Sequence, residues 1–350
     1  MPRLRTFNLT THLLTTAPPA VMPLLFGIVV ITLFVLTLWY LIARPHPHQQ
    51  HLHTNHREPR RWVAYLALAK PRIIPLLLVP TAAAMLMANR LTPVPFPTFV
   101  RLFTLTLCGG AMAAMGAHVF NSYLDRDIDA TMRRTRSRPF PSGLIQPERA
   151  LLFGTLLTIS ATLLLATQVN PLAAALALTG NLFYVLVYSL WLKRRTPQNI
   201  VIGGAAGAVP PLVGWAAITH TIGIPAVLFF AIIYFWTPAH FWALALVREE
   251  DYRAAGIPML PIVRGRRATY RGILEYTILL VIATIALYLT HSMGTVYLIT
   301  ALLLGATFLL KALHLTLHPS AALAWSLFKY SNLYLALLYG AMVIDRLLFH

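Results

Sequence analysis

The sequence predicts an all-α integral membrane protein whose helices cross the bilayer many times. Of its 350 residues, 58% are hydrophobic and 11% are charged, and the mean hydropathy is +0.68. Soluble domains carry about 25% charged residues, so a soluble fold is excluded. Apolar runs of roughly 20 residues, the length that spans a bilayer, recur along the whole chain.

Ten apolar segments are long enough to be transmembrane helices. We expect spans at 22–43, 62–88, 102–120, 150–168, 171–192, 200–219, 222–247, 273–291, 294–313 and 321–346. The uncharged stretch 276–310 is too long for one crossing, and the sequence from His291 to Gly294 marks the turn that divides it. Lys70-Pro71-Arg72 interrupts the second span, where prolines are tolerated when neighbouring helices satisfy the freed carbonyls.

Residues 1–61 are predicted to be an N-terminal extension, and residues 62–350 a domain of nine spans. Span 22–43 is either a membrane anchor or a cleaved signal; it is long for a signal, and no small-residue cleavage site follows it. Five histidines come next, which form either a metal-binding tract or, as their setting favours, a polar linker. They are His46, His48, His51, His53 and His56.

Basic residues concentrate in alternate loops between the predicted spans. Loops 121–149 and 248–271 carry six Arg each, and 193–199 adds three more cations, whereas the intervening loops hold almost none. Loops rich in Lys and Arg face the cytoplasm. The net charge of +18 therefore reflects membrane orientation. We expect the lipid bilayer, and no nucleic acid, as the partner of these charges.

Acidic residues are scarce and clustered. Six of the ten lie in two short segments, Asp125–Asp129 and Glu249–Asp251, each of which follows an apolar span. Ionisable groups at a membrane edge commonly mark ion or substrate sites. The loop charges place both clusters on the same side of the membrane, so we expect them to serve one site.

The first cluster has the spacing of a metal site on a helix. Asn121, Asp125 and Asp129 lie four residues apart and therefore share one helix face. Their hard oxygen ligands suit Mg²⁺, which substrate phosphates usually complete. Ordinary ion pairs, such as Asp129 with Arg133, are the alternative. In the second cluster we rank Asp251 first as a metal ligand, without deciding against its two neighbouring glutamates.

Seven basic residues are predicted to lie on the same side as these acids. A Mg²⁺–diphosphate needs cations for its remaining charge, and Arg offers bidentate hydrogen bonds. The candidates are Lys70, Arg72, Arg133, Arg136, Arg138, Lys193 and Arg194. Most of them are also explained by membrane orientation alone. Lys70 and Lys193 are the stronger candidates, because apolar sequence flanks each of them.

Two histidines within predicted spans are candidate ligands. His240, in Trp236-Thr-Pro238-Ala-His240, is a candidate for binding haem iron or polarising a substrate group, and a buried, hydrogen-bonded histidine is an equal alternative. His118 carries the same alternatives with less support. As a facing pair the two would suit a haem-binding electron carrier. The glycines of segment 199–214 predict close helix packing and lack the context of a dinucleotide fingerprint.

Taken together, these segments resemble the UbiA superfamily of intramembrane prenyltransferases over residues 62–346. The motifs that carry the resemblance are Leu68-Ala-Lys70-Pro71-Arg72, Asn121–Asp129 with Arg134–Pro139, Tyr188–Arg194 and Asp251–Pro261. The first cluster matches the superfamily's Asn-xxx-Asp-xxx-Asp pattern, and Asp251–Pro261 is similar to the haem-modifying branch. Other branches have a second Asp-xxx-Asp motif here, whereas this chain has no Asp at 247 or 255.

The resemblance implies a nine-helix bundle around a central cavity, here with one extra N-terminal helix. It implies that farnesyl diphosphate binds through Mg²⁺ held by Asn121, Asp125 and Asp129, with Asp251 and Lys193 assisting. The allylic cation would then be attacked by a vinyl group of haem B, and water would add to give haem O. An aromatic quinone precursor is an alternative acceptor, and a membrane transporter is a second alternative.

The resemblance further implies haem A synthase or a terminal oxidase as partners. We expect a bacterial inner membrane location, with the site facing the cytoplasm, because no Arg- and Ser-rich presequence is recognisable.

Overall fold

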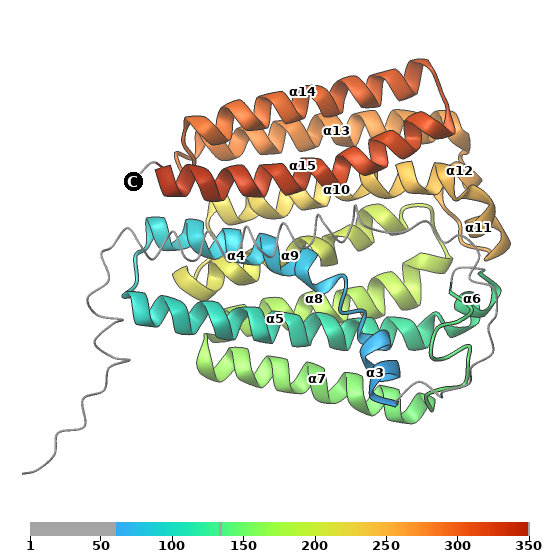
Figure 1. The fold of residues 1–350 in the computed structure, drawn as a ribbon, viewed down its shortest axis with the longest axis horizontal. Coiled ribbons are helices and arrows are strands. Elements are labelled where there is room, and N and C mark those ends of the chain that lie inside the picture. The colour runs from blue at the N-terminus through green and yellow to red at the C-terminus, as the bar shows by residue number, and fades with distance from the viewer. Residues whose placement is uncertain (1–60, 133–134, 349–350) are drawn as a thin grey trace, which may run out of the picture.

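A computed structural model describes residues 61–132 and 135–348. This part of the chain is helical and contains no strand. Nine of its helices are long and apolar enough to cross a membrane, which confirms the predicted number of spans in this region (Figure 1). They are α4 (Ile74–Leu91), α5 (Phe96–Leu124), α7 (Pro147–Gln168), α8 with its continuation (Pro171–Arg194), α9 (Asn199–Thr219), α10 (Ile224–Val247), α13 (Gly265–Leu289), α14 (Thr295–Leu317) and α15 (Ala321–Leu348). The predicted span 22–43 and the histidine tract lie outside the described residues.

The predicted interruption of span 62–88 at Lys70-Pro71-Arg72 is confirmed, but the bounds of the crossing are wrong, because only the part from Ile74 onward spans. α3 (Arg61–Ala69) ends before Lys70, a turn follows, and the crossing helix α4 begins at Ile74. Lys70 has a φ of 50°, outside the helical region. Pro71 also lacks the N–H that would continue the helix, and it disfavours helical geometry at the residue before it. Figure 1 shows α3 lying at an angle to the long helices.

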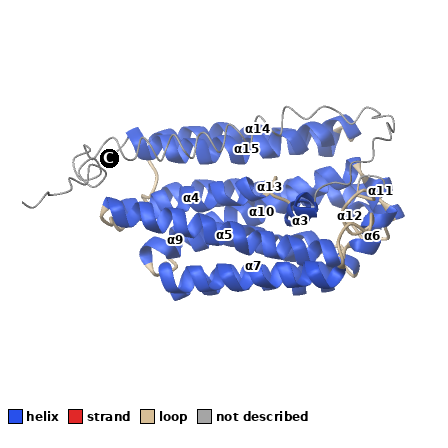
Figure 2. Cartoon of the chain, turned by 60° about the horizontal axis from the view of Figure 1, so that its bottom comes forward, coloured by secondary structure: helices blue, strands red, loops and turns tan. Residues whose placement is uncertain are grey.

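The long helices run side by side and alternate in direction, so every second connection lies at the same end of the bundle. Figure 1 shows the short helices α6 (Arg126–Thr131), α11 (Glu249–Ala254) and α12 (Leu260–Val263) gathered at one end, on the right. In Figure 2, α14 and α15 form one flank and α7 the opposite one. Both predicted acidic segments therefore lie at the same end, which we call the charged end.

Small residues allow α4 and α9 to pack backbone against backbone. A Cβ built on Gly214 of α9 would collide with the carbonyl oxygen of Thr81 in α4. Two turns earlier on α9, a Cβ built on Gly207 would meet no atom within 4 Å. The predicted role of segment 199–214 in close helix packing is thus confirmed at Gly214. A Cβ on Gly203 would likewise collide with the side chain of Tyr188.

One acid outside the two clusters caps a helix at the far end of the bundle. Asp345 of α15 is buried and accepts hydrogen bonds from the backbone N–H groups of Gly294 and Tyr297, at the start of α14. A carboxylate at a helix N-terminus satisfies N–H groups that have no partner within the helix. These hydrogen bonds join α15 to α14. Among the described residues, the far end has no cluster of acids like those at the charged end.

We predict that Gly214→Ala destabilises the protein by about 1–3 kcal/mol, because the added methyl group forces the backbones of α4 and α9 apart. Gly207→Ala is the matched control on the same helix, and we expect it to leave stability unchanged or slightly raised, since alanine favours helix. Thermal unfolding of both variants in detergent measures the difference. Equal midpoints for the two would contradict the close approach.

Candidate functional site

The predicted metal-site residues lie together at the charged end. Asn121 belongs to the last turn of α5, Asp125 follows that helix, and Asp129 lies in α6. Backbone hydrogen bonds from Asp125 to Asn121 (2.9 Å) and from Asp129 to Asp125 (2.7 Å) keep the helical path. All three residues are buried, and Asn121 Nδ2 donates to Asp125 Oδ2 at 2.8 Å. Helical continuity thus gives the four-residue spacing its shared face.

Three cations contact the row formed by Asn121, Asp125 and Asp129, and two of them come from distant parts of the sequence. Lys70, at the turn before α4, donates to Asn121 Oδ1 at 2.7 Å. Lys193 Nζ lies 2.5 Å from Asp125 Oδ2, and Arg138 contacts both oxygens of Asp129 at 2.8 Å. When Lys70 is protonated, three cations therefore face two carboxylates. The cluster then carries one excess positive charge, which suits an anionic ligand.

The Lys70 ammonium is strongly affected by its surroundings. Burial lowers the pKa of Lys70 to about 7, with Arg138 acting in the same direction and Asp125 against it. A cation in an enclosed position is stabilised when an anion comes within a few ångströms.

One carboxylate oxygen in the cluster has no hydrogen-bond partner among the described residues. Asp125 Oδ1 is buried and unpaired there, although Oδ2 of the same group contacts both Asn121 and Lys193. A buried acceptor without a partner costs about 1–3 kcal/mol. No group of three His, Cys, Asp or Glu side chains in the described residues is close enough to hold a metal ion. The unpaired Oδ1 of Asp125 is nevertheless an oxygen donor of the kind that hard cations bind.

A stretch of π-helix faces α5 and forms one side of the cluster. α8 (Pro171–Leu182) continues as the π-helix η1 (Phe183–Trp191) and ends in a 3₁₀ turn, η2 (Leu192–Arg194). Ser189 of η1 is buried, accepts a hydrogen bond from Asn121 Nδ2 at 3.1 Å and donates to the Tyr184 carbonyl at 2.8 Å. Wide helical turns often occur at functional sites. Ser189 was not predicted as a site residue. Its position four residues before Lys193 is the only signal in the sequence that indicates a role.

The other predicted basic residues differ in their contacts and their exposure. Arg194 donates to both oxygens of Asp127 at 2.6 and 2.7 Å and to the Leu124 carbonyl at 2.6 Å. These hydrogen bonds hold the pKa of Asp127 at about 2. Arg194 thus ties the end of α5 to the segment that carries Lys193. Arg72 and Arg136 are exposed near the cluster, and Arg133 lies outside the described residues.

The second acidic segment adjoins the first through packing. Ile257 and Met259 belong to the same buried cluster as Ile128 of α6. A cleft of about 280 Å³ lies between the two segments, with Asp127, Thr131 and Arg194 on one side and residues 254–257 on the other. The structure therefore brings the two predicted motifs to neighbouring positions.

The acids of the second segment are held by arginines. Asp251 is 42% exposed and lies 3.8 Å from Arg248, and no contact to the first cluster is seen among the described residues. Glu249 is bonded to Arg253 at 2.7 Å and Arg266 at 2.9 Å. Burial works against ionisation of Glu249, but hydrogen bonds from Arg266 and Arg253 outweigh it and leave its pKa below the usual range.

The two candidate histidines differ in their surroundings. His240 of α10 is buried, and its Nδ1 lies 2.7 Å from Ser331 Oγ. His118 of α5 is also buried, but neither ring nitrogen has a partner among the described residues, and its ring meets that of Tyr184 edge-on at 5.6 Å. In this part of the chain the rings of His118 and His240 contact other aromatic rings and not each other, so they do not form the facing pair that the electron-carrier alternative would need.

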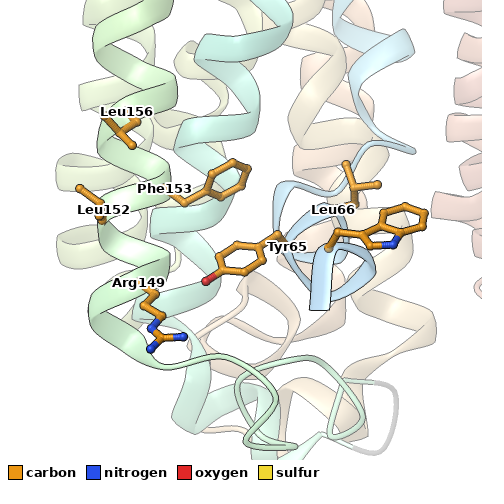
Figure 3. Close-up of a pocket in the computed structure, with 7 residues that line it drawn as sticks. Tyr65, Leu66, Arg149, Leu152, Phe153 and Leu156 are labelled. Atoms are coloured by element: carbon orange, nitrogen blue, oxygen red, sulfur yellow. The ribbon is translucent and has the colours of Figure 1, made fainter. Parts of the chain in front are cut away.

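A larger, apolar groove lies outside this cluster, on the flank of the bundle. It encloses about 770 Å³ between α3 and α7. Figure 3 shows Tyr65 of α3 pointing toward Phe153 and Arg149 of α7, and the Tyr65 and Phe153 rings are 5.3 Å apart. The seven lining residues include no carboxylate. The groove therefore takes no part in a metal site.

Comparison with known sequences identifies the fold family. Residues 77–336 match the UbiA prenyltransferase family. The chain belongs to this family. As a UbiA prenyltransferase it is an enzyme of the membrane, which agrees with its nine candidate spans and removes the support for the transporter alternative.

Several relatives share about half of their residues with this prenyltransferase. A protein of Synechococcus sp. named protoheme IX farnesyltransferase is 51% identical over 285 residues, which cover 81% of this chain and 84% of the relative. One of Trichormus variabilis with the same name is 50% identical over 288 residues, covering 81% and 88%.

Solved structures of more distant proteins share the fold. A structure described as digeranylgeranylglyceryl phosphate synthase matches with a TM-score of 0.69 at 20% identity, covering 82% of this chain and 99% of that one. A UbiA homologue from Archaeoglobus fulgidus, bound to DMAPP and Mg²⁺, matches with a TM-score of 0.54 at 18% identity, covering 80% and 99%. The predicted UbiA-type helical bundle is thereby confirmed.

We predict that Lys193→Ala destabilises this prenyltransferase by about 3–5 kcal/mol, because the substitution leaves the buried Asp125 carboxylate without its cation. Arg194→Ala is the matched control: its ion pair with Asp127 is exposed, and exposed pairs contribute about 0–1 kcal/mol. Thermal unfolding in detergent compares the two. In the double variant Lys193→Ala, Asp125→Asn, much of the stability should return, because no buried charge is then left unpaired.

Proposed function

We propose that the enzyme transfers the farnesyl group of farnesyl diphosphate to a vinyl group of protohaem IX, with addition of water, to give haem O. The observation that carries this proposal is the identity of about 50% with proteins named protoheme IX farnesyltransferase, which extends over 81% of the chain. The run Asp251–Pro261, which resembles the haem-modifying branch, points to the same acceptor rather than to an aromatic quinone precursor.

The buried cluster at the charged end supports diphosphate binding. Asn121, Asp125 and Asp129 offer oxygen ligands, of which Asp125 Oδ1 has no partner, so the residues fit a divalent cation. We assign Mg²⁺ to these three residues, with Asp251 as a fourth candidate that would have to turn away from Arg248. A homologue of the family was solved with DMAPP and Mg²⁺. When bound, the ion would neutralise charge on the departing diphosphate.

The cations around the cluster are suited to the leaving group. Lys70, Lys193 and Arg138 are the nearest, and each has an acid or amide partner whose contact an anion can replace. Preorganised cations of this kind stabilise negative charge as it develops in the transition state. We propose further contacts from Arg72, Arg133 and Arg136. Arg194 acts on the site through its pair with Asp127, which holds the segment carrying Lys193.

The reaction itself is a substitution followed by hydration. The bond between C1 of the farnesyl group and the diphosphate oxygen breaks, and both electrons leave with diphosphate. The vinyl group of haem then bonds to C1, and the resulting cation on the haem side takes up water and loses a proton. Apolar surroundings protect the allylic cation from earlier attack by water. The apolar packing around His240 and its buried position make that residue our candidate contact for haem.

We place the active site on the cytoplasmic side of a bacterial inner membrane. The loops at the charged end carry most of the arginines, as cytoplasmic loops do. The product would serve haem A synthase or a terminal oxidase. We also retain residues 1–61 as an extension apart from the prenyltransferase domain, since the family match begins at residue 77.

The direct test incubates the purified enzyme with haem B, farnesyl diphosphate and Mg²⁺, followed by mass spectrometry of the extracted haem. We expect a mass gain equal to a farnesyl group plus water. An unmodified haem together with Mg²⁺-dependent binding of diphosphate would reject haem as the acceptor and leave prenyl transfer to another molecule.

We predict that Asp125→Asn lowers the kcat/KM for farnesyl diphosphate on the order of 100-fold, the range seen when one group that stabilises transition-state charge is lost. The loss should grow when Mg²⁺ is limiting. Glu148→Gln is the control, since Glu148 is an exposed carboxylate in the first turn of α7 and has no place in the cluster. Full activity of Asp125→Asn at limiting Mg²⁺ would remove Asp125 from the metal site.

A further inference from the structure

Ser331 of α15 holds the imidazole of His240 in one orientation. We propose that Ser331 is a positioning residue that fixes the proton of His240 on Nδ1, so that the lone pair of Nε2 is presented to the haem iron. This inference rests on the proposed function, because it takes haem as the molecule that His240 meets.

The hydrogen bonds around Ser331 define the tautomer. Ser331 is fully buried, and its Oγ donates to the Phe328 carbonyl at 2.7 Å. A hydroxyl has a single hydrogen and a carbonyl can only accept, so both contacts of 2.7 Å are hydrogen bonds at once only when Ser331 Oγ accepts from His240. In that arrangement Nδ1 of His240 carries the proton, and Nε2 carries the free lone pair.

The ring of His240 is held on both faces as well. Trp236 stacks on it with centroids 4.2 Å apart and Phe328 with centroids 4.6 Å apart, at interplanar angles of 18° and 29°. Trp236 also donates its Nε1–H to the Ser331 carbonyl at 2.7 Å. Ser331 thus accepts hydrogen bonds from two residues one turn apart on α10. A 180° flip of the imidazole would break its contact with Ser331 Oγ, and a smaller rotation would also disturb its stacking on Trp236 and Phe328.

The nitrogen that remains is the one suited to a ligand. Among the described residues, no hydrogen bond to Nε2 of His240 is seen, whereas Nδ1 and both ring faces are occupied. Histidines that bind metals generally donate their other N–H to a nearby acceptor, which sets the tautomer and raises the basicity of the ligand nitrogen. Ser331 supplies such an acceptor to His240.

The first test titrates the purified full-length enzyme with ferric protohaem in detergent. We expect Ser331→Ala to weaken haem binding about 10–100-fold, as loss of a residue that orients a metal ligand usually does. Ser331→Thr, which keeps the hydroxyl, should bind within a few-fold of the unmodified protein. Ser326→Ala is the control on α15, since Ser326 is bonded to Lys311 and has no contact with His240.

Spectroscopy separates positioning from a general loss of structure. In the ferrous complex, resonance Raman should show a lower iron–histidine stretching frequency for Ser331→Ala, because Nδ1–H has lost its acceptor, and the original frequency for Ser331→Thr. In the haem-free enzyme, ¹⁵N shifts should show His240 protonated on Nδ1, with the signal assigned by its disappearance in His240→Gln. Protonation on Nε2 would overturn the proposal whatever the folding of the Ser331 variants.

The outcomes keep the two claims apart. If His240→Gln loses the iron–histidine signal while Ser331→Ala keeps both affinity and frequency, Ser331 has no positioning role and the haem contact stands. If His240→Gln binds haem with an unchanged spectrum, His240 is not an iron ligand, and the inference fails without touching the farnesyl transfer. If haem binds to neither the unmodified enzyme nor His240→Gln, while diphosphate still binds, haem as acceptor is rejected and the inference with it.

Discussion

The pair of buried Asp125 and partly buried Lys193 is the interaction on which the charged end depends. Inside the packed helices the Asp125 carboxylate would be strongly destabilised without a cation, and Lys193 supplies one. Asn121, Ser189 and Lys70 extend this pair into a hydrogen-bonded row, and Arg138 pairs with the last acid of that row. The excess of cations explains how such a cluster is both stable and ready for an anion.

Irregular backbone brings these groups together. The turn at Lys70 redirects the chain between α3 and α4, and the π-helix before Lys193 places Ser189 against Asn121. At the junction of α5 and α6, helical hydrogen bonds continue through Asp125. Within a bilayer such breaks are tolerated where side chains or neighbouring helices satisfy the backbone groups. The departures from regular helix therefore lie where function places the greatest demand on geometry.

The nine crossings of the described region could be predicted because apolar length and loop charge are local properties. The row Asn121, Asp125 and Asp129 was accessible for the same reason, since helical spacing places residues four apart on one face. The interruption at Lys70-Pro71-Arg72 could also be predicted, but not that it separates a short helix from the crossing helix, because a positive φ at Lys70 is not visible in an apolar pattern. Ser189, Ser331 and Asp345 were missed, because each acquires its role from a partner far away in the chain.

The sequence by itself determined the membrane bundle, the side on which its charges gather and the residue types available to bind a cation and a diphosphate. The tertiary structure alone decided which cations meet which residues of the row: Lys70 lies 51 residues from the amide of Asn121, and Lys193 lies 68 from Asp125. It also decided that Asp129 pairs with Arg138 and that Ser331 orients His240. Hydropathy and spacing report on neighbours along a helix, whereas contacts between helices depend on how the whole bundle packs.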